Sequence, residues 1–147
     1  MAHSYFAVYI HAVWSTKERQ PWITPATAVE LYPYLASAVR GQECRAVEVG
    51  GHRDHVHLLI GMAKSILVPD LVKEIKRSTT AWMKEREPQF AWQEGYGAFS
   101  VSVSNLETVR GYIRNQEAHH ATMTWETEFR QLLVKHGITF DERFYLG

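Results

Sequence analysis

The sequence DHVHLLI at residues 54–60 decides most of the fold, because it predicts a buried strand that carries two histidines. Its apolar run, which includes β-branched residues, is typical of strands. Successive side chains of a strand point to opposite faces of the sheet, so His55 and His57 share one face. Two imidazoles side by side on a sheet are half of a metal site, although such pairs are also common among histidines with purely structural roles.

Hydrophobic periodicity on both sides of this stretch predicts further strands and helices. The expected strands cover residues 5–15, 44–49, 54–62 and 98–103, and the expected helices cover residues 26–40, 69–86, 105–120 and 125–136. Residues 50–53 are expected to form a hairpin turn between the second and third strands. The order strand, helix, strand, strand, helix, strand is that of a split βαβ unit. We therefore expect an α+β fold with a ferredoxin-like (RRM-like) four-stranded antiparallel sheet and added C-terminal helices.

One face of this sheet should be covered by helices, and the histidines should lie on the other. The residues that suit the helix-covered face are Val47, Val49, Val56, Leu58 and Ile60. The histidine face is expected to be open, or covered by the added C-terminal helices or by a partner. Glu48, on the neighbouring strand, should share that face with His55 and His57.

Composition limits the class of protein. The chain has 147 residues, 46% of them hydrophobic, which fits one compact domain over residues 1–147. No apolar run approaches the length of a membrane span, and the N-terminus lacks the features of a signal peptide. The single cysteine, Cys44, excludes an intramolecular disulfide and a cysteine-based zinc cluster. A formal net charge of zero argues against coating nucleic acid by bulk charge, and a reducing cytoplasm is the expected location.

A second candidate feature lies on the helix expected over residues 105–120. Gln116 falls near the middle of the apolar stripe of this helix, and Tyr112 precedes it by one turn. A buried glutamine needs partners for its amide, either a metal ion or backbone groups. Tyrosine, whose pKa is normally about 10, acts as a nucleophile when its electrophile is activated. A divalent ion held by His55, His57 and Gln116 would activate a phosphodiester, and two nitrogens with one oxygen suit Mn²⁺ or Mg²⁺.

These motifs together resemble the single-tyrosine HUH transposases, small enzymes of insertion sequences that move as single-stranded DNA, whose relatives include REP-associated tyrosine transposases. "HUH" denotes two histidines around a bulky apolar residue, here Val56. The resemblance covers nearly the whole chain: YIHAVWSTK at residues 9–17, Asp54, HVHLLI at residues 55–60, FAWQEGYG at residues 90–97 and YIRNQ at residues 112–116.

The resemblance implies that Tyr112 is the nucleophile and that His55, His57 and Gln116 bind a divalent metal, Mg²⁺ or Mn²⁺. It further implies a 5′-phosphotyrosine intermediate, hairpin-bearing single-stranded DNA as substrate, and a homodimer in which the tyrosine helix of one protomer can complete the partner's site. A bacterial or archaeal cytoplasm, with action at the nucleoid, follows from the same resemblance.

Other residues are weaker candidates. Glu48, Asp54 and His120 are expected near the metal site, where they could support its histidines, although Asp54 could instead fix the hairpin turn and His120 could end a helix. A possible phosphate-binding track on the second expected helix consists of Lys73, Lys76, Arg77 and Lys84, for which a solvated helix face is the alternative. Aromatic residues of the loop over residues 87–97 could stack on bases or pack in the core.

Three other functions remain open at this level. A domesticated relative would cut repetitive palindromes with the same chemistry. A ferredoxin-like nucleic-acid-binding module would bind without cutting, and would not need Tyr112 and Gln116 in this arrangement. A metal-dependent phosphoesterase would use activated water and leave no covalent adduct.

Overall fold

The computed structural model describes residues 3–143, 145 and 146. Its strands β1 (Tyr9–Ser15), β2 (Arg45–His52), β3 (His55–Gly61) and β4 (Gly97–Val101) form one antiparallel sheet in the order β2-β3-β1-β4. The helices are α1 (Pro25–Gly41), α2 (Val68–Lys84), α3 (Leu106–Arg114), α4 (Gln116–His119) and α5 (Trp125–Lys135). Short 3₁₀ turns occupy Lys17–Arg19 and Val103–Asn105. The predicted α+β fold with a four-stranded antiparallel sheet is confirmed.

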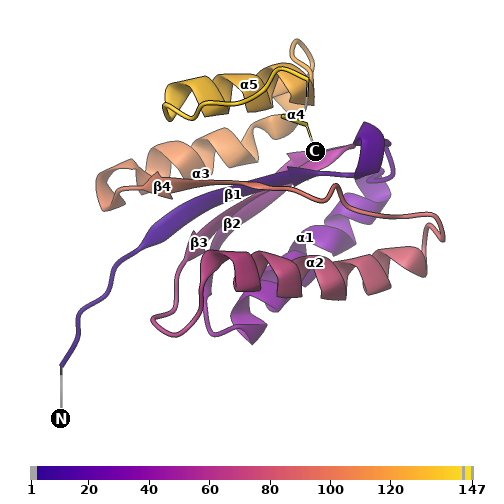
Figure 1. The fold of residues 1–147 in the computed structure, drawn as a ribbon. Coiled ribbons are helices and arrows are strands. Elements are labelled where there is room, and N and C mark those ends of the chain that lie inside the picture. The colour runs from indigo at the N-terminus through magenta and orange to yellow at the C-terminus, as the bar shows by residue number, and fades with distance from the viewer. Residues whose placement is uncertain (1–2, 144, 147) are drawn as a thin grey trace.

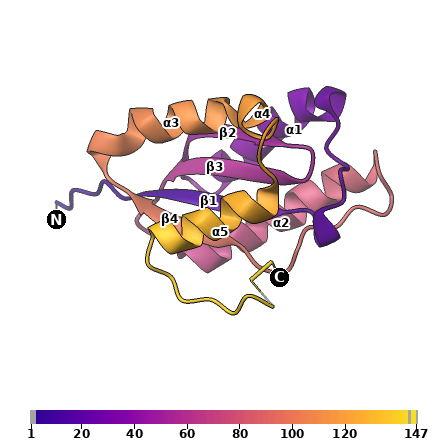
Figure 2. The same ribbon diagram turned by 90° about the horizontal axis from the view of Figure 1, so that it is seen from above.

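The helices form layers on both sides of the sheet. Helices α1 and α2 lie against one face, and α3, α4 and α5 lie over the other (Figure 1). Figure 2 shows α3 and α5 lying over the sheet roughly along the direction of its strands, with β3 and β1 visible between them. The second face is therefore covered by the C-terminal helices of the same chain. No helix among the residues described has both the length and the hydropathy needed to cross a membrane.

The main core fills the layer between the sheet and helices α1 and α2. Val56, Leu58 and Ile60 are fully buried in it, and Val49 packs against it, as the alternation of the strands predicts. The prediction for Val47 is wrong. A register shift between Ala46 and Glu48 leaves Val47 without a place in the regular alternation, so Ala46 packs on the core in its stead.

A smaller core lies under α5. It consists of Val13, Phe99, Trp125, Phe129, Leu132 and Leu133, all buried. Thr124 caps the start of α5, since its side chain accepts a hydrogen bond from the backbone N–H of Thr127. The predicted cap at Gly137 is confirmed by its φ of 68°. This small core fixes the position of α5 above the histidine face.

The β2–β3 hairpin is tighter than predicted. Strand β2 continues to His52, which pairs with His55, so the turn falls at residues 53–54 rather than 50–53. The glycines of this hairpin serve close packing instead. A Cβ atom on Gly50 would lie 2.7 Å from the carbonyl oxygen of Ile113, so only glycine lets α3 approach β2 this closely.

Two other boundaries differ from the predictions. The pairing of β1 begins at Tyr9, opposite Gly61, and the preceding Tyr5 is 96% exposed. The helix expected over residues 105–120 is broken at Asn115, whose φ and ψ of −92° and 15° end α3 before Gln116 begins α4. Asparagine is often found at such ends because its side chain competes for backbone hydrogen bonds.

Candidate active site and metal centre

Strand β3 places His55 and His57 side by side. Both are fully buried, and their ring centroids lie 5.1 Å apart. They pair across the sheet with Ser15 and Val13 of β1, on the face that α3 and α5 cover. The predicted common face of the two histidines is therefore what the structure shows.

The Nδ1 atom of each histidine already has a partner. Nδ1 of His55 lies 2.8 Å from Oδ1 of Asp54, and Nδ1 of His57 lies 2.8 Å from Nε2 of His11. These bonds fix the orientation of both rings and leave the Nε2 atoms directed toward the C-terminal helices. The carboxylate of Asp54 therefore lies in the position from which it can orient the ring of His55. The backbone carbonyl of Asp54 accepts a hydrogen bond from the backbone N–H of Thr16.

The C-terminal helices bring the other two predicted residues to the same place. Gln116 is 1% exposed, and its Oε1 atom lies 2.8 Å from Nε2 of His55. The ring of Tyr112 packs at right angles to that of His57, with centroids 5.7 Å apart. Tyrosine, glutamine and both histidines therefore meet within one chain.

Glu128 is the residue that joins this group, and the sequence analysis did not single it out. It is 1% exposed, and its carboxylate accepts hydrogen bonds from the hydroxyl of Tyr112 and from Nε2 of Gln116, the latter at 2.9 Å. Its Oε1 atom lies 3.1 Å from Nε2 of His57 and 3.3 Å from Nε2 of His55. A carboxylate buried to this extent requires such partners, because desolvation of its charge is costly.

A signal for Glu128 does exist in the sequence. The buried stripe of α5 is formed by Trp125, Glu128, Phe129, Leu132 and Leu133. A single acidic residue at helical spacing among large apolar residues indicates either a buried functional carboxylate or a short helix with a frayed face. The ring of Trp125 stacks on that of His55, with centroids 4.5 Å apart. Since Trp125 and Glu128 are on the same buried stripe of α5, this contact places Glu128 beside the histidines.

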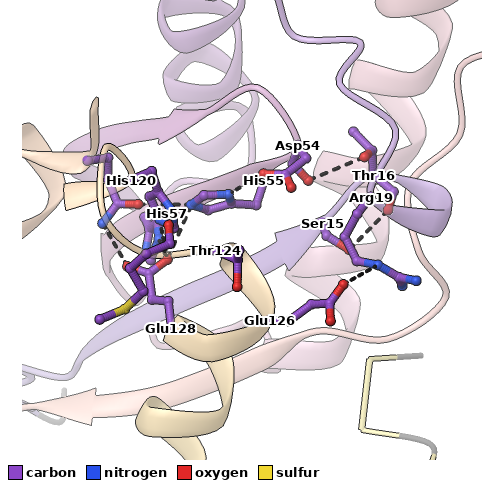
Figure 3. Close-up of polar contacts among 12 residues, drawn as sticks. Ser15, Thr16, Arg19, Asp54, His55, His57, His120, Thr124, Glu126 and Glu128 are labelled. Atoms are coloured by element: carbon purple, nitrogen blue, oxygen red, sulfur yellow. Dashed lines mark hydrogen bonds and ion pairs between the residues drawn. The ribbon is translucent and has the colours of Figure 1, made fainter. Parts of the chain in front are cut away.

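His120 reaches the same carboxylate from the segment between α4 and α5. Its Nε2 atom lies 2.9 Å from Oε1 of Glu128, and its Nδ1 atom lies 2.6 Å from the carbonyl oxygen of Met123. Figure 3 shows His55, His57 and His120 gathered around Glu128. His120 therefore lies beside Glu128 and the ring of His55, and its support of a metal site stays a prediction.

The charges of the site are set by burial and by these bonds. Burial favours a neutral His55, but the hydrogen bonds to Asp54 and Glu128 outweigh it and raise the pKa of His55 to about 9. Burial dominates at His57 and lowers its pKa to about 4. Burial opposes the charge of Glu128, yet hydrogen bonds from His120, His55 and His57 hold its carboxyl pKa far below the usual range.

The pKa of Tyr112, the candidate nucleophile, is shifted in the opposite direction to that of Glu128. Burial and the neighbouring charge of Glu128 both raise the pKa of Tyr112 above its usual range. Tyr112 is therefore a neutral phenol that donates its proton to Glu128 in a hydrogen bond. A cation beside Glu128 would offset the negative charge that disfavours the phenolate.

A groove of about 350 Å³ gives access to Tyr112 between α3 and α5. Its walls include Tyr112, His119 and Glu128, together with Lys135 and His136 from the C-terminal end of α5. Cationic and hydrogen-bonding side chains thus line the approach to the tyrosine hydroxyl.

Several weaker candidates lie elsewhere. Glu48 shares the face of the histidines, as predicted, but its carboxylate binds the guanidinium groups of Arg110 and Arg114 on α3, at 3.4 Å and 2.9 Å. The expectation that it supports a histidine is corrected: it anchors the helix that carries Tyr112. Phe90 and Trp92 are buried in the main core, where packing rather than base stacking accounts for them.

The basic residues of α2 lie on the far side of the sheet from the histidines. Lys73 and Lys84 are exposed, and Arg77 pairs with Glu74 on its own helix. Lys76 does not project into solvent: its ammonium donates hydrogen bonds to the carbonyl oxygens of Gln93 and Gly95, at 2.8 Å and 2.6 Å. Lys76 therefore holds the loop before β4, which corrects its assignment to a phosphate track.

Comparisons with known proteins agree with this geometry. Residues 4–116 match the family model described as "Transposase IS200 like", and no curated protein matches the chain. A candidate transposase from Deinococcus radiodurans R1 is similar in structure, with a TM-score of 0.64 and 24% identity over 79% of this chain and 95% of that one. A REP-associated tyrosine transposase bound to a REP hairpin has a TM-score of 0.59 and 14% identity over 95% of this chain and 88% of that one. The chain belongs to the IS200-like transposase family.

Proposed function

We propose that this transposase cleaves and rejoins single-stranded DNA through a covalent bond to Tyr112. The hydroxyl oxygen of Tyr112 attacks a phosphodiester, a bond forms between that oxygen and phosphorus, and the bond from phosphorus to the 3′ oxygen breaks. The tyrosine proton is transferred to the departing 3′ oxygen. The products are a 5′-phosphotyrosine and a free 3′-hydroxyl. Attack by a 3′-hydroxyl reverses the step and joins strands without ATP, because the phosphotyrosine retains the bond energy.

One observation carries this proposal. The hydroxyl of Tyr112 and the Nε2 atoms of both histidines converge on the same buried carboxylate, that of Glu128. Simple nucleic-acid binding does not require a partly buried tyrosine hydroxyl beside two imidazoles whose Nδ1 atoms are already bonded. A nucleophile beside a cation site accounts for this arrangement.

We further propose that His55, His57 and Gln116 hold a divalent cation, Mg²⁺ or Mn²⁺. The fit rests on the donor set: two imidazole nitrogens and an amide oxygen, all buried, lie next to the negative charge of Glu128. Asp54 and His11 hold the imidazoles in the orientation that a ligand needs. When bound, the cation would neutralise charge on the non-bridging oxygens of a phosphodiester.

The proposed substrate is single-stranded DNA that bears a hairpin. Support comes from the similar REP-associated transposase, which was bound to a REP hairpin. The groove between α3 and α5 leads to Tyr112 and is lined by Lys135 and His136, which suits a polyanion. Since Tyr112 lies beside the histidines of its own chain, we propose that each active site is formed within one protomer. A homodimer, which the resemblance to transposases implies, stays a prediction.

The test is an adduct assay with hairpin-bearing single-stranded DNA, Mn²⁺ and the full chain. We expect a covalent protein–DNA species that survives denaturant and retains the label of the fragment on the 3′ side of the cut. Tyr112→Phe and chelator should abolish it, whereas Tyr5→Phe, which changes an exposed tyrosine, should not. Cleavage that persists in Tyr112→Phe would exclude Tyr112 as the nucleophile.

The same assay separates the alternatives. A phosphoesterase that uses activated water would cut the DNA and leave no adduct, and a binding module would shift the DNA on a native gel without cutting it. A domesticated relative would form the adduct on repetitive palindromes, so the sequences that flank the gene would distinguish it from a mobile element.

A further inference from the structure

The C-terminal segment places two more donor groups against the imidazoles of the proposed metal site. The Oε1 atom of Glu128 is approached by three imidazole Nε2 atoms, from His120 at 2.9 Å, His57 at 3.1 Å and His55 at 3.3 Å. The side chains of His120 and Glu128 are 3% and 1% exposed. We propose that Glu128 is a ligand of the same ion as His55 and His57, and that His120 joins them when the ion binds, an inference that rests on the proposed metal site.

The orientation of His120 matches that of the other two histidines. Each ring has its Nδ1 atom engaged: by Asp54 for His55, by His11 for His57, and by the carbonyl oxygen of Met123 for His120. In a metal-binding histidine whose Nδ1 is engaged, Nε2 gives up its proton and its lone pair binds the ion. In this structure the same Nε2 atoms face the carboxylate of Glu128. His120 is therefore prepared as a ligand in the same way as the two residues of the HUH motif.

Glu128 supplies the anionic donor. Its carboxylate belongs with His55 and His57 to a group whose ligand atoms all lie within 4.8 Å of one another, which is close enough to share an ion. It also belongs to a second such group with His119 and His120. Both groups contain Glu128, but His120 is not in the group of His55 and His57, so the four ligand atoms do not all lie within 4.8 Å of one another. His120 reaches the ion of the β3 histidines only if its ring moves toward them when the ion binds. His119 is the less suitable ligand, because its Nε2 atom is 3.5 Å from Glu128 and its side chain is 29% exposed.

These donors lie outside the region that matches the family model, which ends at residue 116. Helix α5 carries Glu128, and the segment before it carries His120. An ion bound by them and by the histidines of β3 would connect the C-terminal segment directly to the sheet. Several imidazoles with one carboxylate also favour a transition-metal ion over Mg²⁺, which prefers oxygen ligands and retains its water. The inference therefore narrows the expected metal to Mn²⁺ or a similar first-row ion.

The experiment is a titration of the chelator-treated full chain with Mn²⁺, in which the loss of the free-ion EPR signal measures binding. Glu128→Gln and His120→Gln should each weaken the Mn²⁺ affinity about tenfold or more, as His55→Gln should. Glu126→Gln changes an exposed carboxylate on the same helix and should bind Mn²⁺ as the wild type does. Circular dichroism and urea unfolding establish that each variant is folded.

A second measurement keeps the inference testable if Glu128→Gln does not fold. Electron spin echo modulation of bound Mn²⁺, in wild type labelled with ¹⁵N-histidine, should show one more coupled imidazole nitrogen than His120→Gln shows. The inference would be overturned if His120→Gln and Glu128→Gln both bind Mn²⁺ as the wild type does while His55→Gln loses binding. That result would leave the proposed metal site intact. Loss in His119→Gln but not in His120→Gln would overturn the assignment of His120. Unchanged binding in His55→Gln would instead reject the proposed metal site itself.

Discussion

The Nε2 atom of His11 lies 2.8 Å from the Nδ1 atom of His57, and both residues are buried. His11 is on β1 and His57 is on the adjacent β3, so one strand of the sheet orients a proposed metal ligand on the next. Removal of the His11 imidazole would leave a buried nitrogen of His57 without its partner. The consequence should be measurable both in metal binding and in stability.

We therefore predict that His11→Phe weakens Mn²⁺ binding by about tenfold to a hundredfold. The same variant should lower the free energy of unfolding by about 1–3 kcal/mol, because a buried polar atom loses its hydrogen bond. Calorimetric titration and urea unfolding measure the two effects. His11→Gln, which retains an amide in place of the ring nitrogen, should recover part of the affinity. Equal Mn²⁺ affinity in His11→Phe and the wild type would show that His57 needs no support from β1.

The proposed assembly of each site within one protomer leads to a second prediction. Tyr112→Phe lacks the proposed nucleophile and His57→Gln lacks a proposed ligand, so each protein alone should form no DNA adduct. A mixture of the two should also form none, because a site with Tyr112 and His57 from different chains is not expected. The measurement is the adduct assay on single variants and on mixtures refolded together. Restored adduct in the mixture would mean that the tyrosine helix is shared across a dimer.

Gly50 controls the approach of the tyrosine helix to the sheet. A Cβ atom at this position would lie 2.7 Å from the carbonyl oxygen of Ile113, which is backbone and can move only with α3. We predict that Gly50→Ala lowers the free energy of unfolding by about 1–3 kcal/mol and reduces adduct formation, because Tyr112 moves with the helix. Urea unfolding and the adduct assay measure these effects.

The matched control for this variant is Gly111, in α3 itself. A Cβ atom there would meet nothing within 4 Å, so Gly111→Ala introduces no collision next to Tyr112. We expect it to stabilise the helix by about 0.5–1 kcal/mol and to leave the adduct yield unchanged. If Gly50→Ala and Gly111→Ala behave alike, close packing of β2 and α3 is not what positions the tyrosine.

Glu48 provides a fourth prediction, which separates anchoring of α3 from support of a histidine. Its carboxylate binds Arg110 and Arg114, so Glu48→Gln should weaken the attachment of the tyrosine helix. We expect the initial rate of adduct formation to fall while the Mn²⁺ affinity stays that of the wild type. Arg114→Gln should reproduce this result, since it removes the shorter of the two contacts, 2.9 Å in length. A loss of Mn²⁺ affinity in Glu48→Gln would restore the role in the metal site that the sequence suggested.

The partly buried ammonium of Lys76 should make the free energy of unfolding depend on pH in the alkaline range. Burial lowers the pKa of Lys76 from 10.5 to about 8 in the folded chain. The unfolded state therefore binds more protons between these two pKa values, and the contribution of Lys76 to stability rises with pH across that interval. Below pH 8 the ammonium is charged in both states, and its desolvation weakens the fold by a constant amount.

The measurement is urea unfolding of wild type and Lys76→Met from below pH 8 to pH 10.5. The difference in unfolding free energy between wild type and Lys76→Met should shift in favour of the wild type as the pH rises. Lys73→Met, an exposed position on the same helix, should show no such shift relative to the wild type. Parallel pH profiles for wild type and Lys76→Met would mean that the Lys76 ammonium is not desolvated by the fold.

Much of this architecture follows from local patterns. The alternation in residues 54–60 was sufficient to place His55 and His57 on one face, because the two-residue period of a strand needs no tertiary information. The order of periodic segments was sufficient for the topology of the sheet. The sequence predicted that Tyr112 and Gln116 lie on the same side of their helix. They do so despite the break at Asn115, because both side chains contact Glu128.

Other features depend on contacts that no local pattern specifies. The bulge that displaces Val47 arises from the pairing of β2 with β3. The same pairing continues to His52, which leaves residues 53–54 for the turn, while Gly50 and Gly51 lie within β2 in close contact with Ile113 and with the backbone of β3. The partners of Glu48 and Lys76 are likewise distant in sequence. A charged side chain on a predicted face has several partners within reach, and only the packed structure selects among them.

The histidine pair and the tyrosine could therefore be identified from the chain alone. For Glu128 the sequence indicates a buried carboxylate on the helix, but not that this carboxylate contacts the histidines and the tyrosine. Glu128 lies 71 residues from His57 in sequence, and it reaches the histidines only because Trp125 and Phe129 bury the apolar face of α5 against the sheet. Periodicity identifies which face of a helix is buried, but the point at which that face meets the sheet is decided by side-chain packing between segments far apart in the chain.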